Sequence, residues 1–294
     1  MGKSLFAAKH LKSEKDARTY LEQLRWPNGP ICPRCSATKI YRLNVTGTTR
    51  EVLKCAGCRK QFSVTVGTIF EDSHIPLTSW LHAIQLMSSS KKGFSAHQLH
   101  RMLGLTYKSA WFMAHRIRHA MAQPIFMDKL GGTVEVDETY VGGKGHSFGR
   151  STETKVPVVA LVERGGRVRS FVMPKITSKN LKGAVRAHVD PSAKLMTDCY
   201  PLYKGLDKEF ASHDRLNHYY KEWVRGDAHT NTVEGYFSLL KRGLTGTYHH
   251  VSKQHLHRYL AEFDFRYSAR KEDDAMRSML AVKGTEGKRL QYQH

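Results

Sequence analysis

The C-terminal half of the chain contains three acidic residues, Asp137, Asp198 and Glu234, whose types and positions suit a divalent-metal site. Mg²⁺ prefers carboxylate oxygens and keeps several waters, so a few protein ligands are enough to hold it. Two such ions about 3.5–4 Å apart can activate a nucleophilic oxygen and stabilise the leaving 3′ oxygen of a phosphodiester. If the fold brings the three acids together, they predict phosphodiester cleavage or transfer with two Mg²⁺ ions, for which Mn²⁺ can substitute.

Each acid also has a simpler interpretation. Glu135 and Asp137 share one face of a predicted strand, so one of them could merely pair with an arginine. Asp198 could cap a loop, and Glu234 could be an exposed helix acid paired with a lysine or arginine. The spacing alone decides little, because any chain of this length offers three acids.

The stretch "HTNTVEGYFSLLKRG", residues 229–243, predicts a helix that carries several polar groups on one side. Asn231 and Glu234 are three residues apart, so they lie on nearly the same face. Lys241 follows Glu234 by seven residues and lies on that side two turns further on. We expect Glu234 to be the third metal ligand, with the amide of Asn231 as the alternative, and Lys241 to meet DNA phosphate.

The N-terminal third offers a second set of ligands, the thiols of Cys32, Cys35, Cys55 and Cys58. Their spacing, C-x2-C-x19-C-x2-C, is typical of a structural zinc site with four thiolates. The residues between the two pairs alternate as the strands of a hairpin do. Two unrelated pairs of buried cysteines are the alternative, which the specific spacing disfavours. The sequence therefore predicts a zinc ribbon that holds one Zn²⁺.

The elements around the acids form an alternating pattern of strands and helices. "GTVEVDETYV" and "KVPVVALVERGGRVRSFVM" predict three strands, the last two joined by a turn at Gly165 and Gly166. A helix capped by Thr177 or Ser178 and the buried strand "AKLMTDCY" follow. Asp198 ends that strand, at the sheet edge where α/β folds build their sites.

The N-terminal part predicts helices on either side of the cysteines. Ser13 caps the first, and another runs from Ser79 to about Ser88. Next, "SAHQLHRMLGLTYKSAWFMAHRIRHAM" predicts two helices that turn at Gly104, which matches a helix-turn-helix. An ordinary helical hairpin is the alternative. In the second of these helices we expect Ala110, Met113, Ile117 and Met121 to face inward, and Lys108, His115, Arg116 and Arg118 to face outward.

The composition points to a polyanionic partner. The 294 residues include 47 Lys and Arg against 26 Asp and Glu, a net charge of +21 and a pI near 9.8. A basic surplus of this size attracts nucleic acid. Neither a targeting signal nor a membrane-length apolar run is visible, so we expect a cytoplasmic, nucleoid-associated protein without a membrane partner. The length allows about two domains.

A family resemblance joins these patterns. From about Tyr20 to Arg270, the chain resembles insertion-sequence transposases of the DDE group, specifically the ISXO-type family with an N-terminal zinc ribbon. The carrying segments are "RWPNGPICPRC", "CAGCRKQFSVTVGTIFEDSHIPLTSWLHAI", "VEVDETYVGGK", "LMTDCYPLY", "HTNTVEGYFSLLKRGLTGTYHHVS" and "LAEFDFRY". The resemblance implies an RNase H-like core with a catalytic Asp-Asp-Glu (or Asn) set and a following lysine. Matched by position, these are Asp137, Asp198, Glu234 (or Asn231) and Lys241.

The predicted fold class is accordingly α/β, with an RNase H-like mixed sheet preceded by a zinc ribbon and a helix-turn-helix. The predicted domains are an N-terminal helix (1–28), the ribbon (29–75), the helix-turn-helix (76–122), the catalytic core (131–270) and a C-terminal tail (271–294). We expect a glycine-rich loop from Gly142 to about Lys155 to be mobile without DNA. The predicted DNA contacts are Lys108, Arg116, Arg118, Lys144, Arg150, Lys241 and Arg242.

The predicted function is that of a DNA transposase. It would bind the terminal inverted repeats of its element, cleave there and transfer the freed 3′-OH ends to target DNA. Two ends must be joined, so we expect a homo-oligomer in the synaptic complex. Two alternatives stay open at this stage: an RNase H-like nuclease or resolvase without strand transfer, and a zinc-ribbon DNA-binding regulator with an inactive core.

Overall fold

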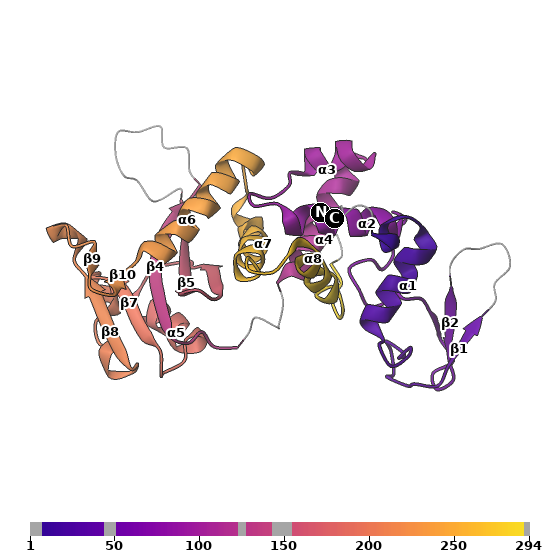
Figure 1. Ribbon diagram of the computed structural model, residues 1–294, viewed down its shortest axis with the longest axis horizontal. Helices are drawn as coiled ribbons and strands as arrows, with labels where there is room; N and C mark the ends of the chain where they lie inside the picture. The colour runs from indigo at the N-terminus through magenta and orange to yellow at the C-terminus, as the bar shows by residue number, and fades with distance from the viewer. Residues whose placement is uncertain (1–7, 44–50, 123–127, 143–154, 291–294) are drawn as a thin grey trace. The chain divides into compact units, whose positions relative to one another are not determined.

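The computed structural model describes residues 8–43, 51–122, 128–142 and 155–290 (Figure 1). The chain divides into two compact units. The described part of the N-terminal unit comprises residues 8–90, 94–122 and 272–290. The second unit comprises residues 91–93 and the described residues between 128 and 271.

The N-terminal unit begins with a short 3₁₀ turn (Lys9–Leu11) and helix α1 (Glu14–Arg25). Ser13 caps α1 as predicted, and its hydroxyl accepts from the backbone N–H of Asp16 at 3.1 Å. The three-stranded ribbon follows, with strands β1 (Ile40–Leu43), β2 (Val52–Cys55) and β3 (Gln61–Phe62) in that order. The antiparallel pairing of β1 with β2 confirms the predicted hairpin.

Helices α2 (Leu77–Ser89), α3 (Ala96–Leu103) and α4 (Tyr107–Met121) complete the first part of this unit. Ser95 and Gln98 form a reciprocal capping box at the start of α3. Gly104 ends α3 with a φ of 65°, a left-handed conformation that glycine adopts without strain. The short connection of Gly104, Leu105 and Thr106 places α3 directly against α4, as the predicted helix-turn-helix requires.

Helix α4 corrects part of the prediction for its basic residues. The four residues expected to face inward are all buried, and Lys108 is exposed. Arg116 and Arg118, predicted as DNA contacts, are instead 7% and 2% exposed, and His115 is also buried. The Arg116 guanidinium donates to the carbonyls of Ile69 (2.7 Å) and Glu71 (3.0 Å) inside the N-terminal unit. Other segments cover more of α4 than one helical face, so both arginines are buried inside the unit and do not face outward as predicted.

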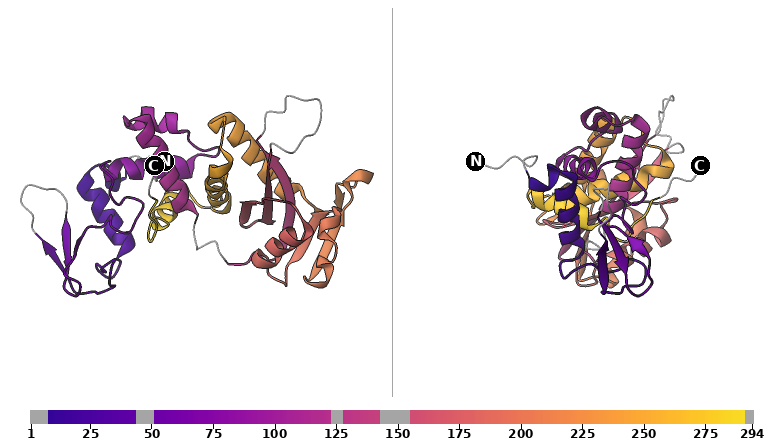
Figure 2. Two further views of the ribbon diagram at one scale, coloured as in Figure 1. Left: turned by 180° about the vertical axis from the view of Figure 1, so that it is seen from behind. Right: turned by 90° about the vertical axis from the view of Figure 1, so that its right-hand side faces the viewer.

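Residues 272–290, which the sequence sets apart as a tail, belong to the N-terminal unit. They contain helix α8 (Asp274–Lys283), which begins at the cap Asp273 and packs against α2 and α4. In the left view of Figure 2, the yellow α8 lies beside the purple helix α4. Lys288 then donates to the carbonyls of His119 (2.9 Å) and Ala120 (3.1 Å) at the end of α4. Residues 272–290 are therefore part of the packed N-terminal unit and not a separate tail.

The second unit is built on a mixed five-stranded sheet of order β6-β5-β4-β7-β8. Its strands are β4 (Thr133–Val141), β5 (Val156–Glu163), β6 (Val168–Val172), β7 (Lys194–Asp198) and β8 (Ser212–Leu216). The first three are antiparallel, and Gly165 makes the predicted turn between β5 and β6 with a φ of 70°. β4, β7 and β8 are parallel. The predicted mixed α/β class is confirmed.

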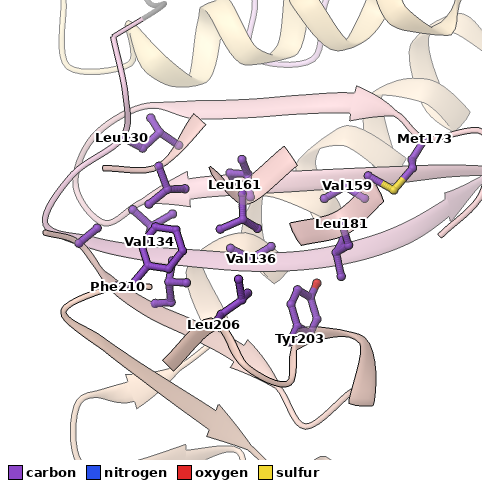
Figure 3. Packing of buried hydrophobic residues seen from close by; sticks show 14 residues of the cluster. Leu130, Val134, Val136, Val159, Leu161, Met173, Leu181, Tyr203, Leu206 and Phe210 are labelled. Atoms are coloured by element: carbon purple, nitrogen blue, oxygen red, sulfur yellow. The ribbon is translucent and has the colours of Figure 1, made fainter. Parts of the chain in front are cut away.

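Two hydrophobic cores cover opposite faces of the sheet because β5 is buried on both sides. Val159 and Leu161 face one core, which Figure 3 shows with Leu181 of helix α5 (Ser178–His188) and Tyr203. The residues of β5 that alternate with Val159 and Leu161 face the second core, which lies beneath helices α6 (Asn231–Gly243) and α7 (Leu256–Ser268). This is the alternation expected of a central strand. The second core therefore packs α6 against the face of the sheet that contains the acidic strand β4.

The remaining short elements connect these parts. They are the two-stranded pair β9 (Val224–Arg225) and β10 (Ala228–His229), a π turn (Leu244–Tyr248), and the 3₁₀ turns Pro201–Tyr203, Leu206–Lys208, His218–Tyr220 and Lys253–His255.

Candidate functional site

The four cysteines of the ribbon converge as predicted. Their Sγ atoms all lie within 4.8 Å of one another, with Cys32 to Cys58 at 3.7 Å and Cys35 to Cys55 at 3.5 Å. Four thiolates around a tetrahedral Zn²⁺ at about 2.3 Å would be about 3.8 Å apart, so the spacing fits this ion. Each pair is followed by a residue in the left-handed region, Ser36 (φ 58°) and Arg59 (φ 59°). The two halves of the site therefore repeat one backbone turn.

Two neighbouring parallel strands bring the first two acids together. The last pair in register between β4 and β7 is Glu135 with Met196. Asp137 and Asp198 each follow that pair by two residues, so they lie near each other at the same end of the two strands. Both side chains are half-buried. The juxtaposition depends on the crossover through α5, which makes β4 and β7 neighbours.

The third acid comes from α6, which faces β4 across an open groove of about 510 Å³. Glu234 lies on the groove side of its helix and is exposed to solvent. Lys241 and Arg242 lie on the same helix and are also exposed. The groove is lined by Asp137, Glu138, Thr139, Glu234, Phe237, Ser238, Lys241 and Arg242. The groove thus combines an acidic end with a basic end, and Asn231 is not among its lining residues.

The carboxylates of the acidic end influence one another's pKa. The pKa of Asp137 is raised to about 7, chiefly because burial disfavours the charged form. The backbone N–H of Glu138 donates to Asp137 and lowers this pKa, while the charges of Glu138, Asp198 and Glu234 raise it further. Carboxylates that repel one another in a partly buried site attract a cation, which would relieve that repulsion.

Glu138 is a fourth carboxylate of the site that was not predicted. Burial and the charge of Asp198 raise its pKa, and it accepts a 2.6 Å hydrogen bond from the hydroxyl of Tyr203. Tyr203 is itself fully buried in the core. The sequence signal that could have found Glu138 is its place directly after Asp137 near the end of β4, where both residues line the groove.

The start of α6 separates the two candidates for the third ligand. Thr230 donates its hydroxyl to Glu234 Oε1 at 3.0 Å, which orients that carboxylate. Asn231 is the first residue of α6 and is exposed. Because Glu234 lines the groove and Asn231 does not, the geometry favours Glu234.

Glu135 resolves one alternative that the sequence left open. Of the two acids on this face of β4, it is Glu135 that pairs with an arginine, since Arg164 Nε donates to it at 2.6 Å. The carboxylate of Glu135 is fully buried, whereas that of Asp137 reaches the groove. Asp137 therefore stays available for a metal ion.

The predicted DNA contacts have different outcomes in the structure. Lys108, Lys241 and Arg242 are exposed, and the last two line the groove. Arg116 and Arg118 are buried, as described above. Lys144, Arg150 and nearly all of the glycine-rich loop predicted to be mobile lie outside the described residues.

Comparisons with known proteins place the chain in a family. Residues 129–268 match the family described as "ISXO2-like transposase domain", and residues 12–61 match "Transposase zinc-ribbon domain". The chain belongs to the ISXO2-like transposase family. It is also 32% identical over 272 residues to an "Uncharacterized protein in transposable element ISH50" of Halobacterium salinarum, which covers 86% of this chain and 90% of that protein.

The matched ranges coincide with the two sites. The zinc-ribbon match includes all four cysteines, and the transposase match includes Asp137, Asp198 and Glu234. The predicted family, the zinc ribbon and the DDE-type core are thereby confirmed. Among the described residues, no helix has the length and apolar character needed to cross a membrane.

Proposed function

We propose that this transposase binds the ends of its own insertion sequence, cleaves a phosphodiester at each end, and transfers the resulting 3′-OH groups to target DNA. The observation that supports the proposal is that Asp137 and Glu234 line one groove together with Lys241, while Asp198 lies beside Asp137 on the neighbouring strand and its charge acts on the pKa of Asp137. An acidic end suits metal ions, and a basic end suits a phosphate backbone.

The carboxylates of Asp137, Asp198 and Glu234 would hold two Mg²⁺ ions. The donor set fits, because carboxylate oxygens suit Mg²⁺ and the open groove leaves room for its waters. When bound, the ions would activate water or the 3′-OH and stabilise the leaving oxygen. The hydroxyl of Thr230 keeps the Glu234 carboxylate oriented, and Tyr203 does the same for Glu138.

Lys241 and Arg242 would hold the phosphates on either side of the scissile bond. Both are exposed at the basic end of the groove, on the helix that carries Glu234. They follow Glu234 by about two helical turns along α6, which would place phosphate contacts next to the cleavage point. DNA binding through such contacts should weaken steeply with salt.

The zinc ribbon and the α3–α4 pair would recognise the terminal inverted repeats, with Lys108 as an exposed contact near the start of α4. A transposase must act on two ends together, so we propose that the protein works as a homo-oligomer on DNA. The ribbon's own part is to fix the hairpin β1–β2 as a rigid element.

The test uses full-length protein and duplexes that carry the terminal inverted repeats, with Mg²⁺ or Mn²⁺. We expect metal-dependent nicking at the 3′ ends of the element, followed by joining to a target plasmid. Cleavage without joining would support a nuclease or resolvase instead. End binding without any nicking would support a DNA-binding regulator with an inactive core.

A further inference from the structure

A buried carboxylate lies beside the proposed metal site without lining its groove. Glu135 is on β4, two residues before Asp137, and its side chain has no exposed surface. Residues two apart on a strand point to the same face, so both acids point toward α6. Removing a carboxylate from water is costly unless several donors surround it, so the partners of Glu135 show what its burial achieves.

The first turn of α6 supplies three of these donors. The backbone N–H groups of Thr232 (2.7 Å) and Val233 (2.9 Å) donate to Glu135, as does the hydroxyl of Thr232 (2.7 Å). These N–H groups have no partner inside the helix, because the first turn of any α-helix leaves its donors free. A negative charge there also complements the helix dipole. Glu135 thus caps α6 from a strand 97 residues earlier.

Arg164 supplies the countercharge and extends the contact. Its Nε donates to Glu135 at 2.6 Å, while its Nη1 and Nη2 donate to the carbonyls of Asp227 (2.7 Å) and His229 (2.9 Å). Those carbonyls belong to the segment that leads into α6. The pair of Glu135 and Arg164 therefore fixes both the end of that segment and the start of the helix.

This arrangement leaves the usual capping residue with another contact. Thr230 occupies the N-cap position of α6 but makes no side-chain cap hydrogen bond. Its hydroxyl donates to Glu234 instead. With Glu135 as the cap, Thr230 is available to orient the third carboxylate of the site.

We propose that Glu135 is a positioning residue of the metal site, which locks the first turn of α6 onto β4 so that Glu234 stays in register with Asp137. The inference rests on the proposed function, because it takes Asp137 and Glu234 as ligands of a shared cation. One strand then carries both a metal ligand and the group that sets the position of another.

The test compares full-length wild type with Glu135→Gln, which keeps the shape but replaces one acceptor oxygen by a donor. Three quantities are measured: hydrogen exchange at the amides of Thr232 and Val233, Mn²⁺ affinity by calorimetry, and the Mg²⁺ concentration for half-maximal end cleavage. The control is Asp264→Asn, which alters a buried carboxylate of the same unit that accepts from Ser170 and from Tyr236, a residue in the second turn of α6, and makes no hydrogen bond to the first-turn amides that Glu135 caps.

We expect Glu135→Gln to lose exchange protection at those two amides and to weaken both metal measures on the order of 10-fold, while the control changes neither. Thr232→Val removes only the hydroxyl donor and should shift the same quantities less. If Glu135→Gln does not fold, Thr232→Val takes its place in the comparison. Lost protection with unchanged metal affinity would overturn the proposal, as would equal weakening in the control.

The metal-affinity measurement separates this inference from the proposed function. If wild type binds Mn²⁺ but cuts no ends, the transposition mechanism fails, and the effect of Glu135→Gln on affinity still decides the role of Glu135. If wild type shows no Mn²⁺ binding, or only binding that survives in Asp137→Asn, the positioning role is overturned as well.

Discussion

The cysteines of the zinc ribbon and the acids of the proposed metal site are assembled in opposite ways in this transposase. The thiols of the zinc ribbon come from two short turns that lie within 27 residues of one another, and each turn supplies two ligands. The carboxylates come from β4, β7 and α6, and the first and last, Asp137 and Glu234, are 97 residues apart. Local backbone geometry brings the cysteines together, whereas sheet topology and the buried pair of Glu135 and Arg164 position the acids.

The difference has a consequence for stability and function. A four-thiolate site contributes its binding energy directly to the fold of the small ribbon around it. The carboxylates of the acidic site instead repel one another, which disfavours the folded state. The hydrophobic cores stabilise the fold against that repulsion. Loss of a thiolate should therefore affect folding, and loss of a carboxylate should affect chemistry.

The largest expected effect is on the zinc ribbon. Cys55→Ser should release the bound zinc and unfold the ribbon, since structural zinc contributes about 10 kcal/mol or more in small domains. The five-stranded sheet of the other unit should keep its structure. Metal analysis and hydrogen exchange check both points. Cys199→Ser is the matched control, because Cys199 is exposed and is not part of the four-cysteine cluster, and unchanged zinc content is expected.

The carboxylates should show the opposite pattern. Glu234→Gln keeps the shape of the side chain but removes its charge, so end cleavage should fall at least about 10³-fold while thermal stability stays near that of wild type. Asn231→Ala should reduce the rate far less, because Asn231 does not line the groove. Single-turnover nicking measures both. A dead Asn231→Ala with an active Glu234→Gln would reassign the third ligand to the amide.

A pH experiment tests how one buried acid of the second unit affects its stability. Burial raises the pKa of Asp264 to about 7, well above the value of about 3.9 in an unfolded chain. The folded state then keeps a proton between these values that the unfolded state loses, so the free energy of unfolding should fall as pH rises from about 4 to about 7. The contribution is up to about 4 kcal/mol. Denaturant unfolding of wild type and Asp264→Asn across this range isolates it, and parallel curves for the two proteins would contradict the assignment.

The smallest effect concerns the end of the chain. Lys288→Met keeps the aliphatic stem but removes the ammonium that caps the last carbonyls of α4, so the N-terminal unit should lose about 1–2 kcal/mol. Lys283→Met, at an exposed position of α8, should change stability by less than about 0.5 kcal/mol. Chemical denaturation followed by tryptophan fluorescence compares the two. Equal losses would mean that the Lys288 contacts do not stabilise the unit.

The sequence by itself determined the features that depend on near neighbours along the chain. The paired spacing of the cysteines, the capping roles of Ser13 and Ser95, and the glycine turn after β5 each follow from interactions within a few residues. The alternation along β4 placed Asp137 on a strand face for the same reason. Family resemblance then supplied the RNase H-like core and the set of catalytic acids.

Only the tertiary structure decided which faces are covered and by what. Helical periodicity assigned Arg116 to an outer face, but the residues around Ile69 and the end of the chain bury it, and no local pattern encodes those contacts. Glu135 and Asp137 are equivalent in the strand pattern, yet one is buried against Arg164 and the first turn of α6 while the other reaches the groove. The physical reason is that burial and ion pairing depend on segments far apart in the chain, whose positions are set by the packing of the whole unit.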